Sequence, residues 1–431
     1  MNAAVRASML LLAVGCADAT VPDRVSPDAG TIEPTPDADT FHTSLVNAGQ
    51  VCKLLSNRNA SDPTGNDVQH AANVLGADLG IPVVTNDKLY IFFGDTIGYD
   101  TIWGATESHP DSVGYGLDSA TAIAAQPDLL CNRLGIVTLP VSQSIGPGNN
   151  SAIKADFAGA AMLAPSGHSL PEYIHNPSGP SGSTSFPHLP GDFEVPSGAF
   201  AVNGSIYVFY TTVVGPTNVA MKGSYLAKWV SPTTTGPFGY QILYQVDERF
   251  DANGALHGHF INIAAEVVGD YVYLFGTGDY RRSKIYLARK PVAMIDQPGG
   301  FEELGEIVTT PGYGEISVRY FPSLEHWMLL AEELTPSSNH IVAYFAANPE
   351  GPWSAPIVVH DMASSSFRSQ YCCTSEDNCI GQQMFNCNRT GFYGTYLFPA
   401  IDDNATSFKV TYTMSSFSPY NVALFEASFA K

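Results

Sequence analysis

The hydrophobic pattern along the chain consists of short apolar runs separated by turn residues. Five runs rich in β-branched and aromatic residues recur: KLYIFFGDT (88–96), SIYVFYTTV (205–213), YVYLFGTGD (271–279), WMLLAEELT (327–335) and SFKVTYTMS (407–415). A second apolar run follows each of them, at residues 119–127, 224–232, 285–291, 341–349 and 421–429. Such runs are typical of β-strands. The sequence therefore predicts an all-β protein built from repeated groups of strands.

This repeat predicts a five-bladed β-propeller, in which each group of strands forms one blade. Asn203-Gly204 is a strong hairpin signal between two strands of one blade. Asp100–Gly116 and Asp128–Glu194 do not fit the repeat and are predicted to be insertions on the first blade, the second of them including that blade's outer strand. Phe41–Leu55 is predicted to close the ring by adding a strand beside the last blade. We expect the active or binding site on the face where the loops converge.

The stretch Asp78–Thr96 predicts a β-hairpin whose two loop residues are Asn86 and Asp87. In that register Asp78 lies directly opposite Asp95, and opposite residues have Cβ atoms about 4.5–5.5 Å apart. Two carboxylates this close resist joint ionisation, so the pKa of one should rise. Such a pair indicates a metal, a basic partner or acid–base chemistry. The alternative is an Asp that ends a strand beside a Gly-Asp-Thr turn.

Other acids are expected on the same face, namely Glu194, Asp279 and Glu315. Glycosidases use two carboxyl groups, one protonating the leaving oxygen while the other attacks or activates water. We expect Asp78 and Asp95 to form this catalytic pair, with Glu315 or Glu194 assisting. The alternative for Glu194 and Glu315 is a solvated charge at the start of a strand, and Asp279 has adjacent arginines as partners.

Several further side chains are expected to contact a substrate at this face. The predicted substrate-binding residues are Glu194, Trp103, His259, Asn262 and Arg281. Trp103 either stacks on a sugar or packs onto its own blade. His259 either binds substrate hydroxyls or a metal, or is a structural histidine. Asp402-Asp403-Asn404 indicates either a calcium site or an exposed hairpin turn, and we assign no metal site and no cofactor.

The charge balance limits the possible partners. The chain has 431 residues with 41 Asp+Glu against 20 Lys+Arg, a formal net charge of −21. Nucleic acids and anionic membranes are polyanions, so this excess of acids argues against both. The sequence also has no nucleophilic serine elbow, phosphate-binding loop or zinc-protease helix.

The N-terminus resembles a targeting segment. Arg6 and the apolar run Met9–Val14 precede Gly15-Cys16, which resembles a bacterial lipoprotein signal over residues 1–16 with Cys16 as the lipidated residue. The alternative is an ordinary secretory signal. Residues 17–45 are rich in Pro and Asp and are predicted to be a disordered tether before the folded domain at 46–431. The protein is therefore expected outside the cytoplasm, as a surface lipoprotein or a secreted monomer.

Six cysteines remain after Cys16, namely Cys52, Cys131, Cys372, Cys373, Cys379 and Cys387. An even set in an oxidising compartment predicts disulfides, and the sequence leaves their pairing open. Zinc binding by the last four is the alternative, but the adjacent Cys372-Cys373 does not suit the usual ligand spacing.

Together the motifs resemble the bacterial endo-D-arabinanases of five-bladed propeller type, a family formerly catalogued as a domain of unknown function. The likeness spans about Gly76 to Phe429 and rests on GADLGIP, LYIFFGDT, VPSGAF, GSIYVFY, YVYLFGTGDYRRSKIYLAR, GEISVRY, GPWSAP and SPYNVAL. The resemblance implies hydrolysis of internal α-D-arabinofuranosyl linkages in D-arabinan, the polysaccharide of mycobacterial arabinogalactan and lipoarabinomannan. The family's two key acids match Asp78 and Asp95. The long insertions on the first blade and the cysteine-rich segment depart from the family pattern.

Two other function classes remain open. A non-catalytic carbohydrate-binding propeller would keep aromatic side chains such as Trp103 for stacking on sugars and would not need paired acids. A structural or adhesive surface protein is compatible with the negative charge and the cysteine-rich loop. The acidic pair distinguishes these hypotheses and favours the enzyme.

Overall fold

The strands assemble into four antiparallel sheets. The computed structural model describes residues 41–55, 74–98, 111–131, 133–137, 189, 193–214, 220–234, 240–251, 254–335, 338–375, 379–389, 391–417 and 419–431. The first sheet contains β2 (Val74–Thr85), β3 (Lys88–Gly98), β4 (Ser112–Gly116) and β5 (Leu134–Ile136), hydrogen-bonded in that order. The second contains β6 (Phe193–Val202), β7 (Ser205–Val214), β8 (Ala220–Trp229) and β9 (Tyr240–Glu248). The predicted all-β class is therefore confirmed.

The third sheet has seven strands. They are β10 (Asn262–Val268), β11 (Tyr271–Thr277), β12 (Ser283–Pro291), β13 (Glu302–Phe321), β14 (His326–Thr335), β15 (Ser338–Ala346) and β16 (Ile357–Asp361). The long strand β13 serves two neighbours, since its first part pairs with β12 and its second part, from Tyr313, pairs with β14. Dividing the sheet at Tyr313 gives the two units that the repeat predicts. The count of five blades remains a prediction, because the hydrogen bonds join these units into one sheet.

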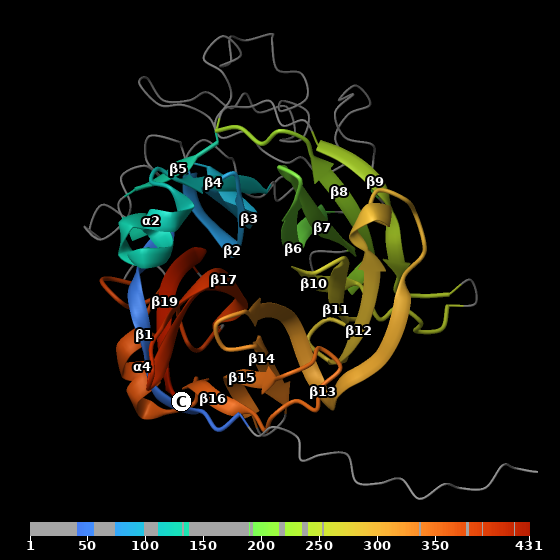
Figure 1. The fold of residues 1–431 in the computed structure, drawn as a ribbon. Coiled ribbons are helices and arrows are strands. Elements are labelled where there is room, and N and C mark those ends of the chain that lie inside the picture. The colour runs from blue at the N-terminus through green and yellow to red at the C-terminus, as the bar shows by residue number, and fades with distance from the viewer. Residues whose placement is uncertain are drawn as a thin grey trace, which may run out of the picture. The chain divides into compact units, whose positions relative to one another are not determined.

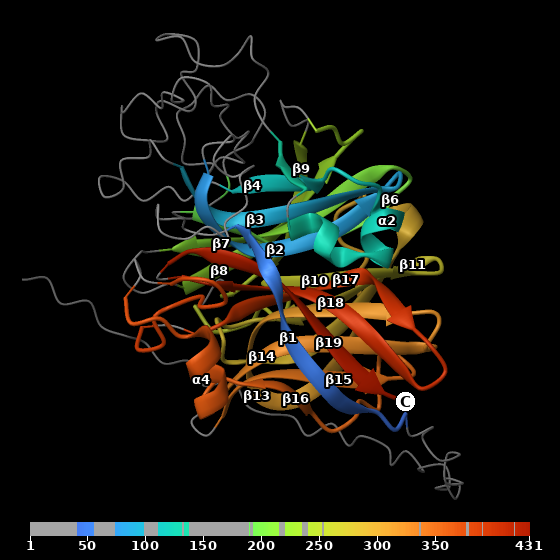
Figure 2. The same cartoon turned by 90° about the vertical axis from the view of Figure 1, so that its left-hand side faces the viewer.

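The last sheet joins the two ends of the folded region. Its order is β1 (Ser44–Leu55), β19 (Asn421–Ala430), β18 (Ser407–Ser416) and β17 (Tyr393–Asp403). β1 pairs antiparallel with β19 from Ser44↔Ala430 to Leu55↔Val422, and Figure 2 shows the two strands side by side. The prediction that Phe41–Leu55 adds a strand to the last repeat is confirmed.

The innermost strands face one another around a common centre. β2 contacts β6, β6 contacts β10, β10 contacts β13, β13 contacts β17, and β17 returns to β2. Figure 1 shows the sheets arranged around this centre. Apolar side chains fill the space between neighbouring sheets; Trp229 of the second sheet, for example, packs edge-on against Tyr90 and Phe92 of the first. Side chains at the ends of the inner strands are therefore brought together from distant parts of the sequence.

One predicted strand is wrong. Residues 119–127 form the helix α2 (Ala120–Ala125) and the start of the 3₁₀ helix η1 (Pro127–Cys131), and the third strand of the first sheet is instead β4, within the expected insertion. The Ser119 side chain caps α2 by accepting a hydrogen bond from the backbone N–H of Ala122. Alanine is the strongest helix former, and this cap with an alanine-rich run outweighs the weak strand pattern.

Two further short helices, η2 (Val292–Met294) and α4 (Ser365–Tyr371), lie outside the sheets. The six cysteines form the disulfides Cys52–Cys131, Cys372–Cys387 and Cys373–Cys379, which confirms the disulfide prediction. No helix within the described ranges is long and apolar enough to cross a membrane.

Candidate active site

The β2–β3 hairpin follows its predicted register for half of its length. Thr85 pairs with Lys88 and Ile81 with Phe92, as the two-residue turn requires. A bulge at Leu79–Gly80 then shifts the register by one residue. Bulges of this kind redirect side chains and are common beside active sites.

The bulge changes the partner of Asp78. Asp78 pairs with Gly94, and the predicted direct opposition to Asp95 is wrong. Leu79 has φ 61° and Gly80 has φ 110°, so the register shift is produced by two residues with a positive φ. The position of this bulge could not be predicted from the alternation of apolar residues, because one extra residue in one strand is enough to form a bulge.

Asp78 and Asp95 nevertheless line the same cavity, which has a volume of about 400 Å³. The other lining residues come from all four sheets and their loops: Leu79, Val195, Pro196, Val213, Met221, Asn262, Tyr280, Arg281, Glu315, Tyr393, Phe417 and Tyr420. The cavity thus combines carboxylates with aromatic and aliphatic walls. Ligand sites typically have this composition, with few polar groups among many apolar ones.

Asp78 is deeply buried, with 6% of its surface exposed. Its Oδ2 accepts a hydrogen bond of 2.8 Å from the Tyr393 hydroxyl. A Cβ atom at position 94 would lie 2.6 Å from Asp78 Oδ1, so only glycine leaves room for this carboxyl. Burial raises the pKa of Asp78 well above its usual range, and the nearby charge of Asp95 raises it further. A carboxyl in this environment favours its protonated form.

Asp95 lies in a more open environment. It is half-buried, has φ 23°, and its Oδ2 accepts a hydrogen bond of 3.0 Å from the Tyr420 hydroxyl. Each of the two aspartates therefore accepts a hydrogen bond from a different tyrosine of the last sheet. Because only Asp78 is nearly excluded from water, the two carboxyl groups are not equivalent. Such a difference between neighbouring carboxyl groups is how acid and base roles are separated in many enzymes.

Two more buried acids surround this pair. Asp111, immediately before β4, is fully buried, and its pKa is raised well above the usual range by burial and then by the charge of Glu194. Glu194 on β6 is 3% exposed, which excludes the alternative of a solvated charge. The charges of Asp95 and Asp78 also raise the pKa of Asp111. The negative potential at this end of the inner strands therefore comes from several elements.

Arg281 provides positive charge beside these acids. Its Nε and Nη2 each donate a hydrogen bond of 3.1 Å to Glu315 of β13, and its Nε lies 3.5 Å from Glu332 Oε2 of β14. Arg281 occupies the turn between β11 and β12 with φ 53°. Burial raises the pKa of Glu332 to about 7, although Arg281 opposes this shift. One arginine thus neutralises part of the charge of two glutamates.

Comparison with known proteins identifies the family. Residues 188–426 match DUF4185, a family described as a domain of unknown function. The chain belongs to the DUF4185 family. The matched range includes Arg281, Glu315 and Tyr393, and it begins after the hairpin that carries Asp78 and Asp95. No curated protein sequence is similar enough to this chain to count as a match.

Several solved structures are similar to this DUF4185 protein at low sequence identity. A protein from Bacteroides ovatus, provisionally named a hydrolase, has a TM-score of 0.51 at 10% identity, covering 84% of this chain and 87% of its own. An α-L-arabinofuranosidase from Podospora anserina has a TM-score of 0.41 at 10% identity, covering 88% and 95%. A family 117 glycoside hydrolase from Zobellia galactanivorans has a TM-score of 0.44 at 11% identity, covering 88% and 90%. At these identities, the first comparison supports the similarity of fold.

The structure brings together only part of the predicted site. Glu315, Arg281 and Asn262 line the cavity with the two aspartates. His259 is not among the lining residues; its ring stacks on Tyr286 with centroids 3.8 Å apart, which favours the structural alternative. Asp279 forms a salt bridge of 2.5 Å with Arg249.

Two predicted residues cannot be placed. Trp103 and Cys16 lie outside the described residues, so their roles remain predictions.

The Asp402-Asp403-Asn404 segment forms a hairpin end, in which Asn404 Oδ1 accepts hydrogen bonds from the backbone N–H groups of Thr406 and Ser407. This favours the turn over the calcium site. Within the described ranges, no group of three or more His, Cys, Asp or Glu residues is arranged to hold a metal ion.

Four aromatic residues of the cavity were not predicted from the sequence, namely Tyr280, Tyr393, Phe417 and Tyr420. A signal existed for two of them, because Tyr420 lies in SPYNVAL and Tyr280 in TGDYRR, both of which are part of the family resemblance. Tyr393 precedes Gly394 at the start of β17 and has no comparable signal. Its role depends on a contact with a hairpin more than three hundred residues earlier.

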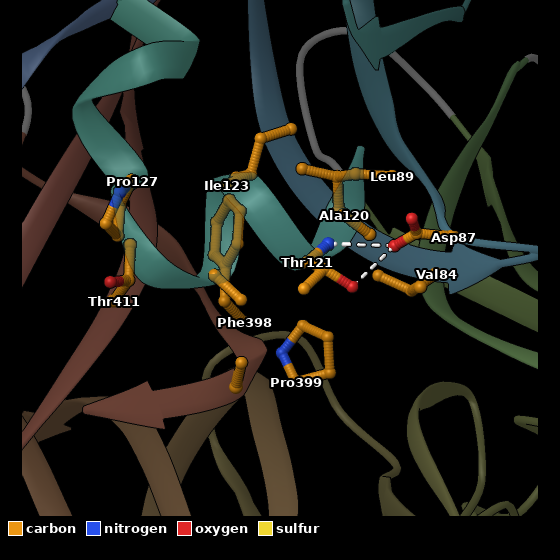
Figure 3. A pocket seen from close by; sticks show the side chains of 12 residues that line it. Val84, Asp87, Leu89, Ala120, Thr121, Ile123, Pro127, Phe398, Pro399 and Thr411 are labelled. Atoms are coloured by element: carbon orange, nitrogen blue, oxygen red, sulfur yellow. Dashed lines mark hydrogen bonds between the residues drawn. The ribbon is translucent and has the colours of Figure 1, made fainter. Parts of the chain in front are cut away.

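A second pocket, of about 250 Å³, lies between the turn of the same hairpin, α2 and the strands β17 and β18 (Figure 3). Its lining is mainly apolar and includes Val84, Ile123 and Phe398. Asp87 is the one charged residue among the described lining residues, and Oδ1 of Asp87 accepts hydrogen bonds of 2.8 Å from both the backbone N–H and the hydroxyl of Thr121. As far as its described lining shows, this pocket lacks the paired acids of the larger cavity.

Proposed function

We propose that this protein is a glycoside hydrolase that cleaves internal α-D-arabinofuranosyl linkages of D-arabinan. The observation that carries the proposal is the presence of Asp78 and Asp95 in one cavity, in environments that differ in burial. Glycosidases need one carboxyl group that is protonated and another that is ionised at the scissile bond. The proposed fold is the five-bladed propeller predicted by the repeat. The hydrolase name of the Bacteroides ovatus neighbour agrees with this activity.

The environments suggest a division of roles. Asp78, whose pKa is raised by burial, is suited to carry the proton that it transfers to the leaving oxygen. Asp95, which is more open, is suited to act on the anomeric carbon directly or through water. Glu315 lies in the same cavity and is held by Arg281. It would either contact the substrate or help to keep the pKa of Asp78 raised through its negative charge. This assignment follows the established division of labour between two carboxyl groups.

The walls of the cavity favour an uncharged sugar chain. Tyr280, Tyr393, Tyr420 and Phe417 provide aromatic surface, on which the apolar faces of sugar rings stack. Arg281 is the one cation among the described lining residues, and it is already paired with Glu315 and Glu332. A uronate or sulfate would therefore meet uncompensated carboxylates. D-arabinan carries no such group and suits this field.

The decisive experiment is incubation of the purified protein with D-arabinan, arabinogalactan and lipoarabinomannan, beside L-arabinan, xylan and galactan. Chromatography of the products should show oligosaccharides from the D-arabinan polymers, as internal cleavage requires. Asp78→Asn and Asp95→Asn should each abolish the products while circular dichroism shows a folded protein. Full activity in either variant would remove that residue from the mechanism. Binding of the polymers without any product would favour the carbohydrate-binding alternative.

A further inference from the structure

Tyr393 contacts two charged elements of the cavity at once. Its hydroxyl donates the 2.8 Å hydrogen bond to Asp78 Oδ2, and its ring lies under the guanidinium of Arg281, 4.7 Å from ring centroid to Cζ. Arg281 holds Glu315 with its bidentate pair of hydrogen bonds. Tyr393 is 5% exposed, so neither contact is weakened by bulk water. Tyr393 therefore contacts both Asp78 of the first sheet and Arg281, the cation of the ion pair in the third sheet.

The backbone of β17 is shaped to place this side chain. A register shift separates Tyr393↔Ser415 from Tyr396↔Thr413, so β17 carries a bulge immediately after Tyr393. The hydroxyl of Ser415, the strand partner of Tyr393, donates a hydrogen bond of 2.5 Å to the carbonyl of Leu79. The bulge that redirects Tyr393 is thus joined to the bulge that redirects Asp78. Both side chains are held by the same contact between the first and last sheets.

The charges that face Asp78 explain why its position needs this support. Acidic groups approach it from three elements: Asp95 from β3, Asp111 from the start of β4 and Glu315 from β13. Arg281 is the opposing cation. The charge of Asp78 in turn raises the pKa of Tyr280, Tyr396 and Tyr420. Among the described residues, a carboxylate at position 78 is favoured by the charge of Arg281 and by the hydrogen bond from Tyr393.

We propose that Tyr393 is a positioning residue that fixes the Asp78 carboxyl in the cavity and couples it to the Arg281–Glu315 pair. Its catalytic consequence rests on the proposed glycosidase function. The donated hydrogen bond stabilises the ionised form of Asp78 and so limits the rise that burial imposes on its pKa. An acid whose pKa lies too high releases its proton poorly, and a carboxyl free to rotate does not reach the leaving oxygen.

The variant Tyr393→Phe tests this proposal, because it removes the hydroxyl and keeps the ring over Arg281. We expect kcat to fall about tenfold with KM little changed. The alkaline limb of the pH–rate profile should move upward by about one pH unit, since loss of the hydrogen bond raises the pKa of the acid. Tyr393→Leu removes the ring as well and should additionally raise KM through displacement of Arg281.

Tyr396→Phe is the matched control. Tyr396 lies on the same strand, is 2% exposed, and its hydroxyl has no hydrogen-bond partner among the described residues. We expect the control to leave the pH profile where it is in the wild type. A shift of the same size in the control would show a general effect of losing a hydroxyl and would overturn the proposal.

A second readout separates this proposal from the proposed function. ¹³C NMR titration of the Asp78 carboxyl, assigned by its loss in Asp78→Asn, measures the effect of Tyr393 without any substrate. We expect the titration to move to higher pH in Tyr393→Phe and not in Tyr396→Phe. An unmoved titration would overturn the positioning role even in an active enzyme. A shifted titration in a protein that cleaves no glycan would preserve the contact and reject the proposed activity.

Discussion

The two ends of the β2–β3 hairpin carry aspartates with opposite properties. At the turn, Asp87 is exposed, and Oδ1 accepts two hydrogen bonds from Thr121, which lower the pKa of the carboxyl. At the open end, Asp78 is buried and accepts one hydrogen bond from Tyr393, and burial raises its pKa. The residue type and the strand pair are the same at both ends. The difference arises from what the rest of the chain places over each end.

The last sheet covers both ends of the hairpin in different ways. At the open end it supplies hydroxyl groups: Tyr393 to Asp78, Tyr420 to Asp95 and Ser415 to the carbonyl of Leu79. At the turn end it supplies Phe398 and Pro399, which leave Asp87 at the rim of a mainly apolar pocket (Figure 3). The buried carboxyl of Asp78 acquires a raised pKa. The exposed carboxyl of Asp87, beside apolar side chains, only stabilises its turn.

The largest difference in activity should appear when the carboxylates of Asp78 and Asp87 are removed one at a time. Asp78→Asn should lower kcat/KM by about 10²–10⁴-fold, the usual contribution of a general acid. Asp87→Asn should leave it within about twofold, because asparagine tolerates the left-handed backbone of this turn, where φ is 55°. The measurement is the initial rate of D-arabinan cleavage. Equal losses in both variants would mean that the two ends of the hairpin do not differ in function.

The next largest effect concerns the ion pair at the open end. Arg281→Met leaves Glu315 and Glu332, both less than 10% exposed, without their cation. Breaking a buried pair from one side typically destabilises a protein by about 3 kcal/mol or more. Urea unfolding should therefore show a reduced free energy of unfolding. Arg133→Met is the control, since the salt bridge of Arg133 with Asp118 is exposed and should contribute little to stability.

The pH dependence of stability should have opposite signs at the two ends. The raised pKa of Asp78 penalises its ionised form in the folded protein, so stability is lost as pH rises from the usual value of 3.8 through the folded value. Asp78→Asn should therefore have a higher Tm than the wild type at pH 7, with a difference that shrinks toward pH 3.8. The lowered pKa of Asp87 contributes stability above 3.8 that is lost as pH falls through its folded value.

Asp87→Asn should accordingly show a lower Tm than the wild type at pH 7 and no difference in strong acid. Thermal melts of the three proteins across pH 3–8 measure both trends. Parallel curves for the two variants would contradict the assignment of opposite pKa shifts.

The smallest effects should come from single hydroxyl groups at the two ends. Ser415→Ala leaves the buried carbonyl of Leu79 without its donor, and we expect a loss of about 1 kcal/mol in the free energy of unfolding. Thr121→Ala removes an exposed hydroxyl from Asp87 and should cost less stability than Ser415→Ala. Urea denaturation of both variants measures the difference. A larger loss at Thr121 would indicate that the turn, not the open end, anchors the hairpin.

Much of the fold could be predicted because strand patterns are local. The apolar runs at residues 205–213 and 407–415 became β7 and β18, and Phe41–Leu55 contributed the predicted closing strand. The run at 119–127 failed because a serine cap and four alanines favoured a helix over a strand. The site was only partly predictable. Its acids lie in the motifs GADLGIP, LYIFFGDT and GEISVRY, whereas Tyr393 looks like an ordinary strand aromatic.

By itself, the sequence determined the all-β class and the hairpin with an aspartate on each strand, because both depend on residues close together in the chain. It also determined the even set of cysteines, because that is a matter of counting. Tertiary structure alone decided that Asp78 is buried, that a bulge moves it away from direct opposition to Asp95, and that Tyr393 and Tyr420 reach these carboxyls from 315 and 325 positions away. A pKa depends on burial and neighbouring charge, and both arise only when distant strands pack together.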